Sequence, residues 1–121
     1  SELTLITALV GGTIALGGGR AELEGELAGG YFVKPTVITG LAHDTRVQQE
    51  EIFGPVVCIY PFSDEQQVID WANSVKYGLS ASVWTRDIKR AQRVALKLQS
   101  GTVWINCWLV VRIHPSIHPS R

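Results

Sequence analysis

The sequence predicts an α/β fold, a three-layer arrangement with a mostly parallel sheet. Short apolar runs rich in β-branched and aromatic residues alternate with segments whose apolar residues recur at helical spacing, in the order strand, helix, strand, helix, strand over residues 56–106. Alternation of this kind implies parallel pairing through right-handed crossovers. The 121 residues are one domain's worth and suffice to bury a core.

The first forty residues carry weaker signals. A short apolar run, 13–16, lies between glycines, and we expect Gly17 to Gly19 to make turns. Phosphate binding by these glycines is the weaker alternative, because neither a Walker lysine nor the dinucleotide spacing follows. Residues 31–39 are typical of a strand, and Pro35 indicates an edge or interrupted one. Polar residues 43–49 predict a connector or a short helical turn.

Two strands and a helix follow. The continuous apolar run 56–60 is typical of a strand covered on both faces. Ser63 and Gln66 fit the capping box of a helix that Gly78 ends, and residues 79–84 read as the next strand.

The last predicted helix starts near Asp87 and closes at residues 100–101, and residues 102–106 form the final strand. Ligands of parallel sheets gather beyond the carboxyl ends of the strands. The sequence therefore predicts that ligands bind in the neighbourhoods of Tyr60, Trp84 and Asn106.

Composition excludes several classes of protein. Apolar residues make up 45% and charged residues 18%, and eleven basic residues balance eleven acidic ones. No long-range field would attract nucleic acid or an anionic membrane, and no apolar run is long enough to span a bilayer. We expect a globular, soluble protein without nucleic-acid or membrane partners.

The two cysteines, Cys58 and Cys107, lie inside apolar runs, where a free thiol behaves as a small hydrophobe. This favours a reducing, cytoplasmic setting, and no secretion signal is evident. In the tail, His114 and His118 are four residues apart, a spacing that can bind zinc on a helix. Each precedes a proline, which favours extended backbone, so we expect a disordered tail and no metal site.

Five spaced motifs occur along the chain: Gly30-Tyr-Phe-Val-Lys-Pro-Thr-Val37, Gln49-Glu-Glu-Ile-Phe-Gly-Pro-Val56, Ala72-Asn73 with Tyr77-Gly-Leu79, Val83-Trp-Thr-Arg-Asp87 and Ser100-Gly-Thr-Val-Trp-Ile-Asn106. Together they resemble the NAD(P)-dependent aldehyde dehydrogenase superfamily. The resemblance is clearest over 17–110 and corresponds to the later part of the family's catalytic domain. Residues 106–108, Asn-Cys-Trp, are most similar to 2-hydroxymuconic and 2-aminomuconic semialdehyde dehydrogenases.

The resemblance implies roles for particular residues. Glu51 matches the glutamate that binds the nicotinamide ribose hydroxyls, and Phe53 matches the aromatic residue near the nicotinamide, whereas Glu50 is expected to be solvated. Residues after the last strand line the substrate entrance in the family, which implies substrate contacts for Trp108, Leu109 and Val111. Three further motif residues, Asn73, Tyr77 and Gly78, are read as architecture, and Trp71, Trp84, Trp104 and Trp108 as core or interface.

No catalytic residue is assigned within this chain. The family's nucleophilic cysteine, general-base glutamate, oxyanion-hole asparagine and Rossmann domain all precede the matching region, and Cys107 is expected to be inert packing. The resemblance implies NAD or NADP as the cofactor of the parent enzyme, an aldehyde as its substrate and a homo-oligomer as its assembly. We expect the isolated chain to bind no cofactor and to be inactive.

The expected organisation is a partial catalytic domain at 1–111 and a non-family tail at 112–121. In the tail Arg112 lies one residue from the place where semialdehyde-oxidising relatives carry a carboxylate-gripping arginine, and we expect it to be exposed. Loss of similarity at both ends indicates a truncated or frame-altered gene product. Two alternatives to an enzyme fragment are a non-catalytic module that oligomerises through exposed strand edges and, ranked last, a cut-down nucleotide binder.

Overall fold

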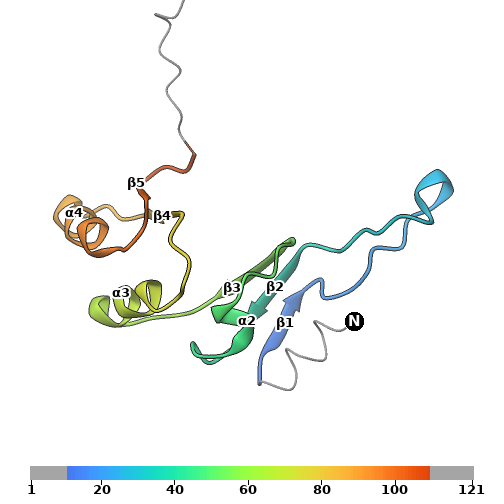
Figure 1. Ribbon diagram of the computed structural model, residues 1–121, viewed down its shortest axis with the longest axis horizontal. Helices are drawn as coiled ribbons and strands as arrows, with labels where there is room; N and C mark the ends of the chain where they lie inside the picture. Colours follow the sequence, from blue (N-terminus) through green and yellow to red (C-terminus); the bar gives the residue numbers. More distant parts are fainter. Residues whose placement is uncertain (1–10, 110–121) are drawn as a thin grey trace, which may run out of the picture. The chain divides into compact units, whose positions relative to one another are not determined.

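The computed structural model describes residues 11–109 and consists of two compact units that divide between Asp64 and Glu65. Unit 1 precedes this division and unit 2 follows it (Figure 1). In neither unit does the described part of the chain contain a helix that is long and apolar enough to cross a membrane.

Unit 1 is built on a three-stranded sheet. Its strands are β1 (Thr13–Leu16), β2 (Thr36–Thr39) and β3 (Val56–Ile59), in the order β1-β2-β3. The β1 strand is antiparallel to β2, whereas β2 and β3 are parallel. Because β2 is central, its side chains are the best buried of the three strands.

The core of unit 1 lies on one face of this sheet. Ile38 of β2 is fully buried and packs with Leu41 and with Val47, which comes from the short helix α2 (Arg46–Gln49). The β3 side chains Val56 and Cys58 face this core, whereas the alternate side chains, Val57 and Ile59, do not. Val57 and Ile59 are 52% and 51% exposed, so the prediction that β3 is covered on both faces is wrong for unit 1. Successive strand residues point to opposite faces, and α2 covers only one.

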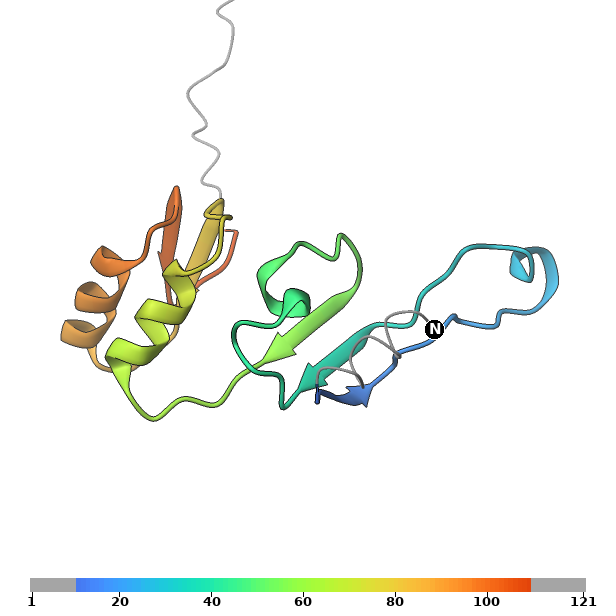
Figure 2. The same ribbon diagram turned by 60° about the horizontal axis from the view of Figure 1, so that its bottom comes forward.

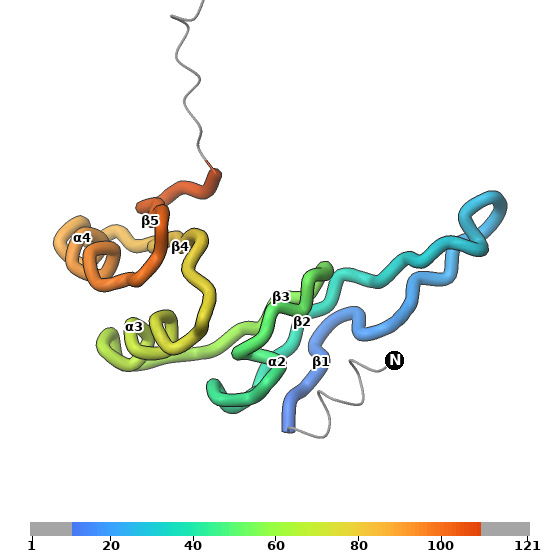
Figure 3. The backbone as a smooth tube through the Cα atoms, viewed as in Figure 1, coloured from blue at the N-terminus to red at the C-terminus, as the bar shows by residue number. Residues whose placement is uncertain are grey.

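Residues 19–34 form an arm that extends from the sheet (Figure 3). Its two sides are joined by hydrogen bonds from the Ala21 amide to the Phe32 carbonyl (2.8 Å) and from the Lys34 amide to the Gly19 carbonyl (3.0 Å). A short 3-10 helix, η1 (Gly25–Leu27), lies between the two sides. The predicted strand 31–39 is therefore shorter than expected: β2 begins at Thr36, after the proline that was expected to interrupt it.

The glycine cluster at the base of the arm has a structural explanation. Gly17 and Gly18 have positive φ, and a Cβ on Gly17 would lie 2.0 Å from the Pro35 carbonyl oxygen. The Gly18 amide donates to the buried Thr36 hydroxyl, which itself donates to the Lys34 carbonyl. These contacts favour the predicted role in turns and close packing over phosphate binding.

Unit 2 contains a strand, helix, strand motif. The strands β4 (Ser80–Val83) and β5 (Thr102–Ile105) are parallel and are connected through α4 (Ile88–Lys97). Helix α4 lies against the sheet and α3 (Glu65–Asn73) lies beside α4 (Figure 2). Asp87 caps α4 as expected, accepting bonds from the amides of Lys89 and Arg90. The expected α/β fold with mostly parallel pairing is confirmed.

The alternating strands do not all belong to one sheet, in contrast to the expectation from sequence. The β3 strand pairs with β2 of unit 1, and β4 pairs only with β5 among the described strands. The helix α3 also begins at Glu65, later than a Ser63 cap would place it. Gln66 directs its side chain to Asp70 and Lys97 instead of completing a capping box.

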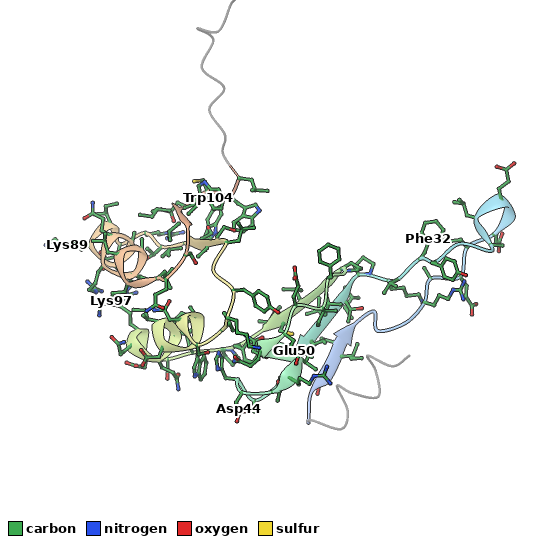
Figure 4. The ribbon with its side chains drawn as sticks, viewed as in Figure 1. Phe32, Asp44, Glu50, Lys89, Lys97 and Trp104 are labelled. Atoms are coloured by element: carbon green, nitrogen blue, oxygen red, sulfur yellow. The ribbon has the colours of Figure 1, made fainter. Side chains whose placement is uncertain are left out.

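Polar contacts join α3 to α4. The Glu65 carboxylate accepts two hydrogen bonds from the Arg93 guanidinium, at 2.7 and 2.8 Å. At the other end, the Asn73 amide donates to the Lys97 carbonyl and accepts from the Gln99 amide, both at 2.8 Å. Figure 4 shows Lys97 on the side of α4 that faces α3. Asn73 is thus a structural residue, as predicted.

Candidate functional site

The two predicted cofactor residues, Glu51 and Phe53, lie together in unit 1 on an open hollow of about 660 Å³. The hollow is formed where the chain leaves α2 and turns into β3. Its lining residues are Val47, Gln48, Glu50, Glu51, Ile52, Phe53, Gly54, Val56, Val57 and Cys58. The structure therefore brings the predicted carboxylate and ring to one concave surface.

The neighbouring acids Glu50 and Glu51 differ in their contacts. Glu50, which is labelled in Figure 4, forms an ion pair with Arg46, one helical turn earlier, at 2.9 Å. Glu51 forms no ion pair within residues 11–109, and its side chain is exposed. A carboxylate in this state keeps its lone pairs for hydroxyl donors. Of the two acids, Glu51 is the better placed to receive a polar ligand.

The backbone that follows Glu51 is fixed by the Gly54-Pro55 corner. The Pro55 carbonyl accepts a 2.8 Å bond from the Thr36 amide, and the Val56 amide donates to the Gly54 carbonyl at 2.7 Å. Phe53 has a φ of +50°, a left-handed conformation, and its side chain is 92% exposed. The ring is therefore presented to solvent beside the hollow by an anchored turn.

Cys58 also lines this hollow, which the sequence did not predict. Burial raises the pKa of its thiol, and a hydrogen bond with the Tyr60 hydroxyl opposes that shift. Burial, together with the nearby Cys58, raises the pKa of Tyr60 to about 12. Both groups are consequently neutral at pH 7. The period of two along β3 could have indicated that Cys58 shares a face with Val56, but not that this face borders a hollow.

The predicted substrate residues belong to unit 2. The Trp108 ring is 5.1 Å from the Trp104 ring, centroid to centroid, and Trp108 and Leu109 are 51% and 62% exposed. Val111 lies outside the described residues. Cys107, between these aromatic residues, is half-buried, and its carbonyl accepts a bond from the Ser82 hydroxyl.

Among the other aromatic residues, Trp84 was expected in a core or an interface; it is 67% exposed and is therefore not part of a core within unit 2. Tyr77 is also about half exposed, although Gly78 is architectural as expected: a Cβ there would lie 2.7 Å from the Gln99 carbonyl oxygen. Trp84 instead borders a second hollow with Asn106, two of the strand ends at which ligands were expected. The third, Tyr60, packs on the core of unit 1.

No metal centre is found in the part of the chain that the structure describes, where no three His, Cys, Asp or Glu side chains group together. His114 and His118, whose spacing raised the question of zinc, lie outside that part, as do Arg112 and the rest of the predicted tail. The expectations for these residues stay predictions.

Known proteins similar to this chain include two semialdehyde dehydrogenases. The 2-aminomuconic semialdehyde dehydrogenase of Danio rerio is 55% identical over 91 residues, which are 75% of this chain and 19% of that protein. The 2-hydroxymuconic semialdehyde dehydrogenase of Pseudomonas putida is 48% identical over 100 residues, 83% of this chain and 21% of that protein. The chain thus spans about a fifth of the length of these curated relatives.

Solved structures agree with these relatives. A betaine aldehyde dehydrogenase from Staphylococcus aureus has a TM-score of 0.82 and 43% identity, covering 91% of this chain and 22% of its own. The NAD+ complex of an aldehyde dehydrogenase from Bacillus cereus has a TM-score of 0.80 and 49% identity, covering 90% and 22%.

The model of the aldehyde dehydrogenase family matches residues 5–118. This range includes part of the segment predicted to be a non-family tail, and the boundary at 111 stays a prediction. A match over most of the chain, with relatives at about half identity, establishes the relationship. This chain belongs to the aldehyde dehydrogenase family.

Proposed function

We propose that this chain is part of the catalytic domain of an NAD(P)-dependent aldehyde dehydrogenase that oxidises a semialdehyde to a carboxylate. The family match and the names of the similar curated proteins support the reaction and the substrate class. The proposal rests chiefly on the hollow of unit 1, which is lined by Glu51, a carboxylate without an ion pair among residues 11–109, and by the exposed Phe53 ring. Within the family, structures with bound NAD+ are known.

In this proposal Glu51 binds the two neighbouring hydroxyls of the nicotinamide ribose. An ionised carboxylate accepts hydrogen bonds only, and its two oxygens can serve two hydroxyl donors at once. Phe53 packs beside the nicotinamide, and its ring has few contacts of its own to give up. Cofactor binding supplies the hydride acceptor, and these residues hold and orient it.

Substrate contacts are assigned to Trp108, Leu109 and Val111, as the resemblance implied. The exposed faces of Trp108 and Leu109 support this assignment, since apolar side chains open to solvent can line an entrance. We further propose that the whole enzyme is a cytoplasmic homo-oligomer.

By itself the 121-residue chain is proposed to have no turnover and no measurable cofactor affinity. The resemblance places the attacking thiolate and the dinucleotide-binding domain in the part of the family's sequence before this region. One ribose contact does not offset the cost of immobilising a dinucleotide. A steady-state assay with aldehyde and NAD should show no NADH; formation of NADH that is lost on Cys107→Ser would contradict this proposal.

The cofactor role is tested in a chimera in which residues 11–109 replace the matching segment of the Bacillus cereus enzyme. Glu51→Gln should raise the KM for NAD about tenfold or more, because a charge-assisted contact is lost. The matched control is Glu50→Gln. Because the Glu50 carboxylate is paired with Arg46, this substitution should leave KM within about twofold. Equal effects of the two substitutions would contradict the assignment.

A second candidate function is an interaction module that oligomerises through strand edges. The observation in its favour is that β3 is an edge strand of unit 1 with Val57 and Ile59 half exposed. Sedimentation velocity of the isolated chain over a hundredfold concentration range tests this. A strictly monomeric chain throughout that range rules the module out.

A further inference from the structure

Unit 2 contains a second hollow, of about 460 Å³, at the carboxyl ends of its two parallel strands. It is lined by Trp84, Thr85, Arg86, Ile88 and Asn106. Residues 84 and 106 directly follow β4 and β5, and Ile88 is the first residue of α4. This is the place in a parallel sheet where ligands commonly bind, because loops diverge there and leave a crevice.

The rim of this hollow is held in a fixed geometry. Asn106 has a φ of +53°, and its side-chain amide binds the backbone of Thr85 twice. The Thr85 amide donates to Asn106 Oδ1 and Asn106 Nδ2 donates to the Thr85 carbonyl, both at 2.9 Å. The two strand ends are thereby tied together, so little ordering is needed when a ligand binds.

The side chains of this hollow that a ligand can contact are two large apolar ones, Trp84 and Ile88, and one cation, Arg86. Trp84 is 67% and Ile88 61% exposed, although both are large apolar residues. Arg86 is exposed and forms no ion pair within residues 11–109. The nearby Asp87 carboxylate is committed to the amides of Lys89 and Arg90, so it does not occupy the guanidinium.

We propose that this hollow binds a small planar carboxylate. The flat face of Trp84 stacks with a conjugated ring or chain, Ile88 covers its edge, and the planar guanidinium of Arg86 pairs with the carboxylate through two parallel hydrogen bonds. The assignment is independent of the cofactor role of Glu51, which belongs to unit 1.

The test uses the full chain and three probes of similar size: benzoate, which is planar and anionic; benzamide, planar and neutral; and cyclohexanecarboxylate, anionic and not planar. Benzoate should bind with a dissociation constant on the order of 1 mM, as a small ligand with one charged contact does. Benzamide should bind about tenfold more weakly and cyclohexanecarboxylate about threefold more weakly.

Nuclear magnetic resonance of the tryptophan indole N–H groups locates the site, and the Trp84 signal should shift during the benzoate titration. Arg86→Gln should raise the dissociation constant about tenfold. The matched control is Lys89→Gln, which removes a neighbouring exposed cation outside the lining and should change nothing. Equal binding of benzoate and benzamide, a shift confined to other tryptophans, or equal effects of Arg86→Gln and Lys89→Gln would each overturn the proposal.

Discussion

Unit 1 and unit 2 are stabilised by different interactions. The core of unit 1 consists of Ile38, Leu41 and Val47, packed between the sheet and α2. In unit 2 only Ile69 and Ala91 are buried among the described apolar residues, and its elements are joined by side-chain hydrogen bonds. Glu65 bonds Arg93, Asn73 bonds the end of α4, and Asn106 bonds Thr85.

The two units should therefore respond to different perturbations. Burial of apolar area depends little on pH or salt, whereas exposed charge pairs depend on both. Unit 1 should therefore be damaged most by truncation of an apolar side chain, and unit 2 by steric or electrostatic changes at its helix contacts.

Ile38→Ala should lower the free energy of unfolding of unit 1 by about 3 kcal/mol, because the removed atoms are fully buried and leave a cavity. Amide hydrogen exchange of β2 and β5 measures the two units separately, and only β2 should lose protection. The control is Ile59→Ala in the same sheet, whose half-exposed side chain should cost only about 1 kcal/mol. Similar losses from both would show that unit 1 has no localised core.

Gly78→Ala should destabilise unit 2 by about 2 kcal/mol, since a Cβ 2.7 Å from the Gln99 carbonyl oxygen forces the backbone apart. Urea unfolding followed by tryptophan fluorescence reports on unit 2, because all four tryptophans lie there. Gly101→Ala is the control within unit 2; its Cβ would lie 3.3 Å from the Leu79 carbonyl oxygen, and the substitution should cost less than half as much as Gly78→Ala. A silent Gly78→Ala would mean that the contact can relax.

Unit 1 should lose stability at alkaline pH through Tyr60. Because its pKa is raised from 10.0 to about 12 in the folded state, its contribution is fully present below pH 10 and is lost as the pH rises through 12. A spectrophotometric titration should show one tyrosine ionising near pH 12, and this step should be absent in Tyr60→Phe. All tyrosines ionising near their ordinary pKa would contradict the predicted burial effect.

Unit 2 should be the acid-sensitive unit, through a small effect of Glu65. The hydrogen bond from Arg93 lowers the pKa of this carboxyl, so its contribution is present above the ordinary value of 4.5 and is lost as the pH falls through the folded-state value. Tryptophan-monitored unfolding at pH 7 and pH 3 should differ less in Glu65→Gln than in the parent chain. Asp70→Asn, which changes an exposed acid on α3 that forms no ion pair within residues 11–109, should leave the difference unchanged.

Much of the fold was predictable because its determinants are local. Asp87 caps the start of α4, and Pro35 interrupts the predicted strand 31–39, so that β2 begins at Thr36. The parallel pairing of β4 and β5 follows from the helix that connects them. The membership of β3 in a different sheet from β4 was missed, because strand pairing depends on contacts distant in sequence. The exposure of Val57 and Ile59 was missed because a continuous apolar run does not indicate which of its faces is covered.

The candidate site was predicted in part. The resemblance to the family implied Glu51 and Phe53, and the structure brings both residues to one hollow. Glu50 differs from Glu51 because it pairs with Arg46, one helical turn earlier. Neither Cys58 in that hollow nor the use of the Asn106 amide as a tie to Thr85 could be read from spacing. Both features depend on which loops and strands lie next to each other in the folded chain, and motif spacing does not indicate that.

Phe53 combines an aromatic ring that is almost wholly hydrated with a left-handed backbone that costs an L-amino acid about 1 kcal/mol or more. Folding of this chain alone gains nothing from such a residue, and glycine would suit the turn better. Phe53→Gly should therefore make unit 1 more stable and remove the proposed packing of the ring beside the nicotinamide. Backbone strain without burial supports the cofactor role proposed for Phe53.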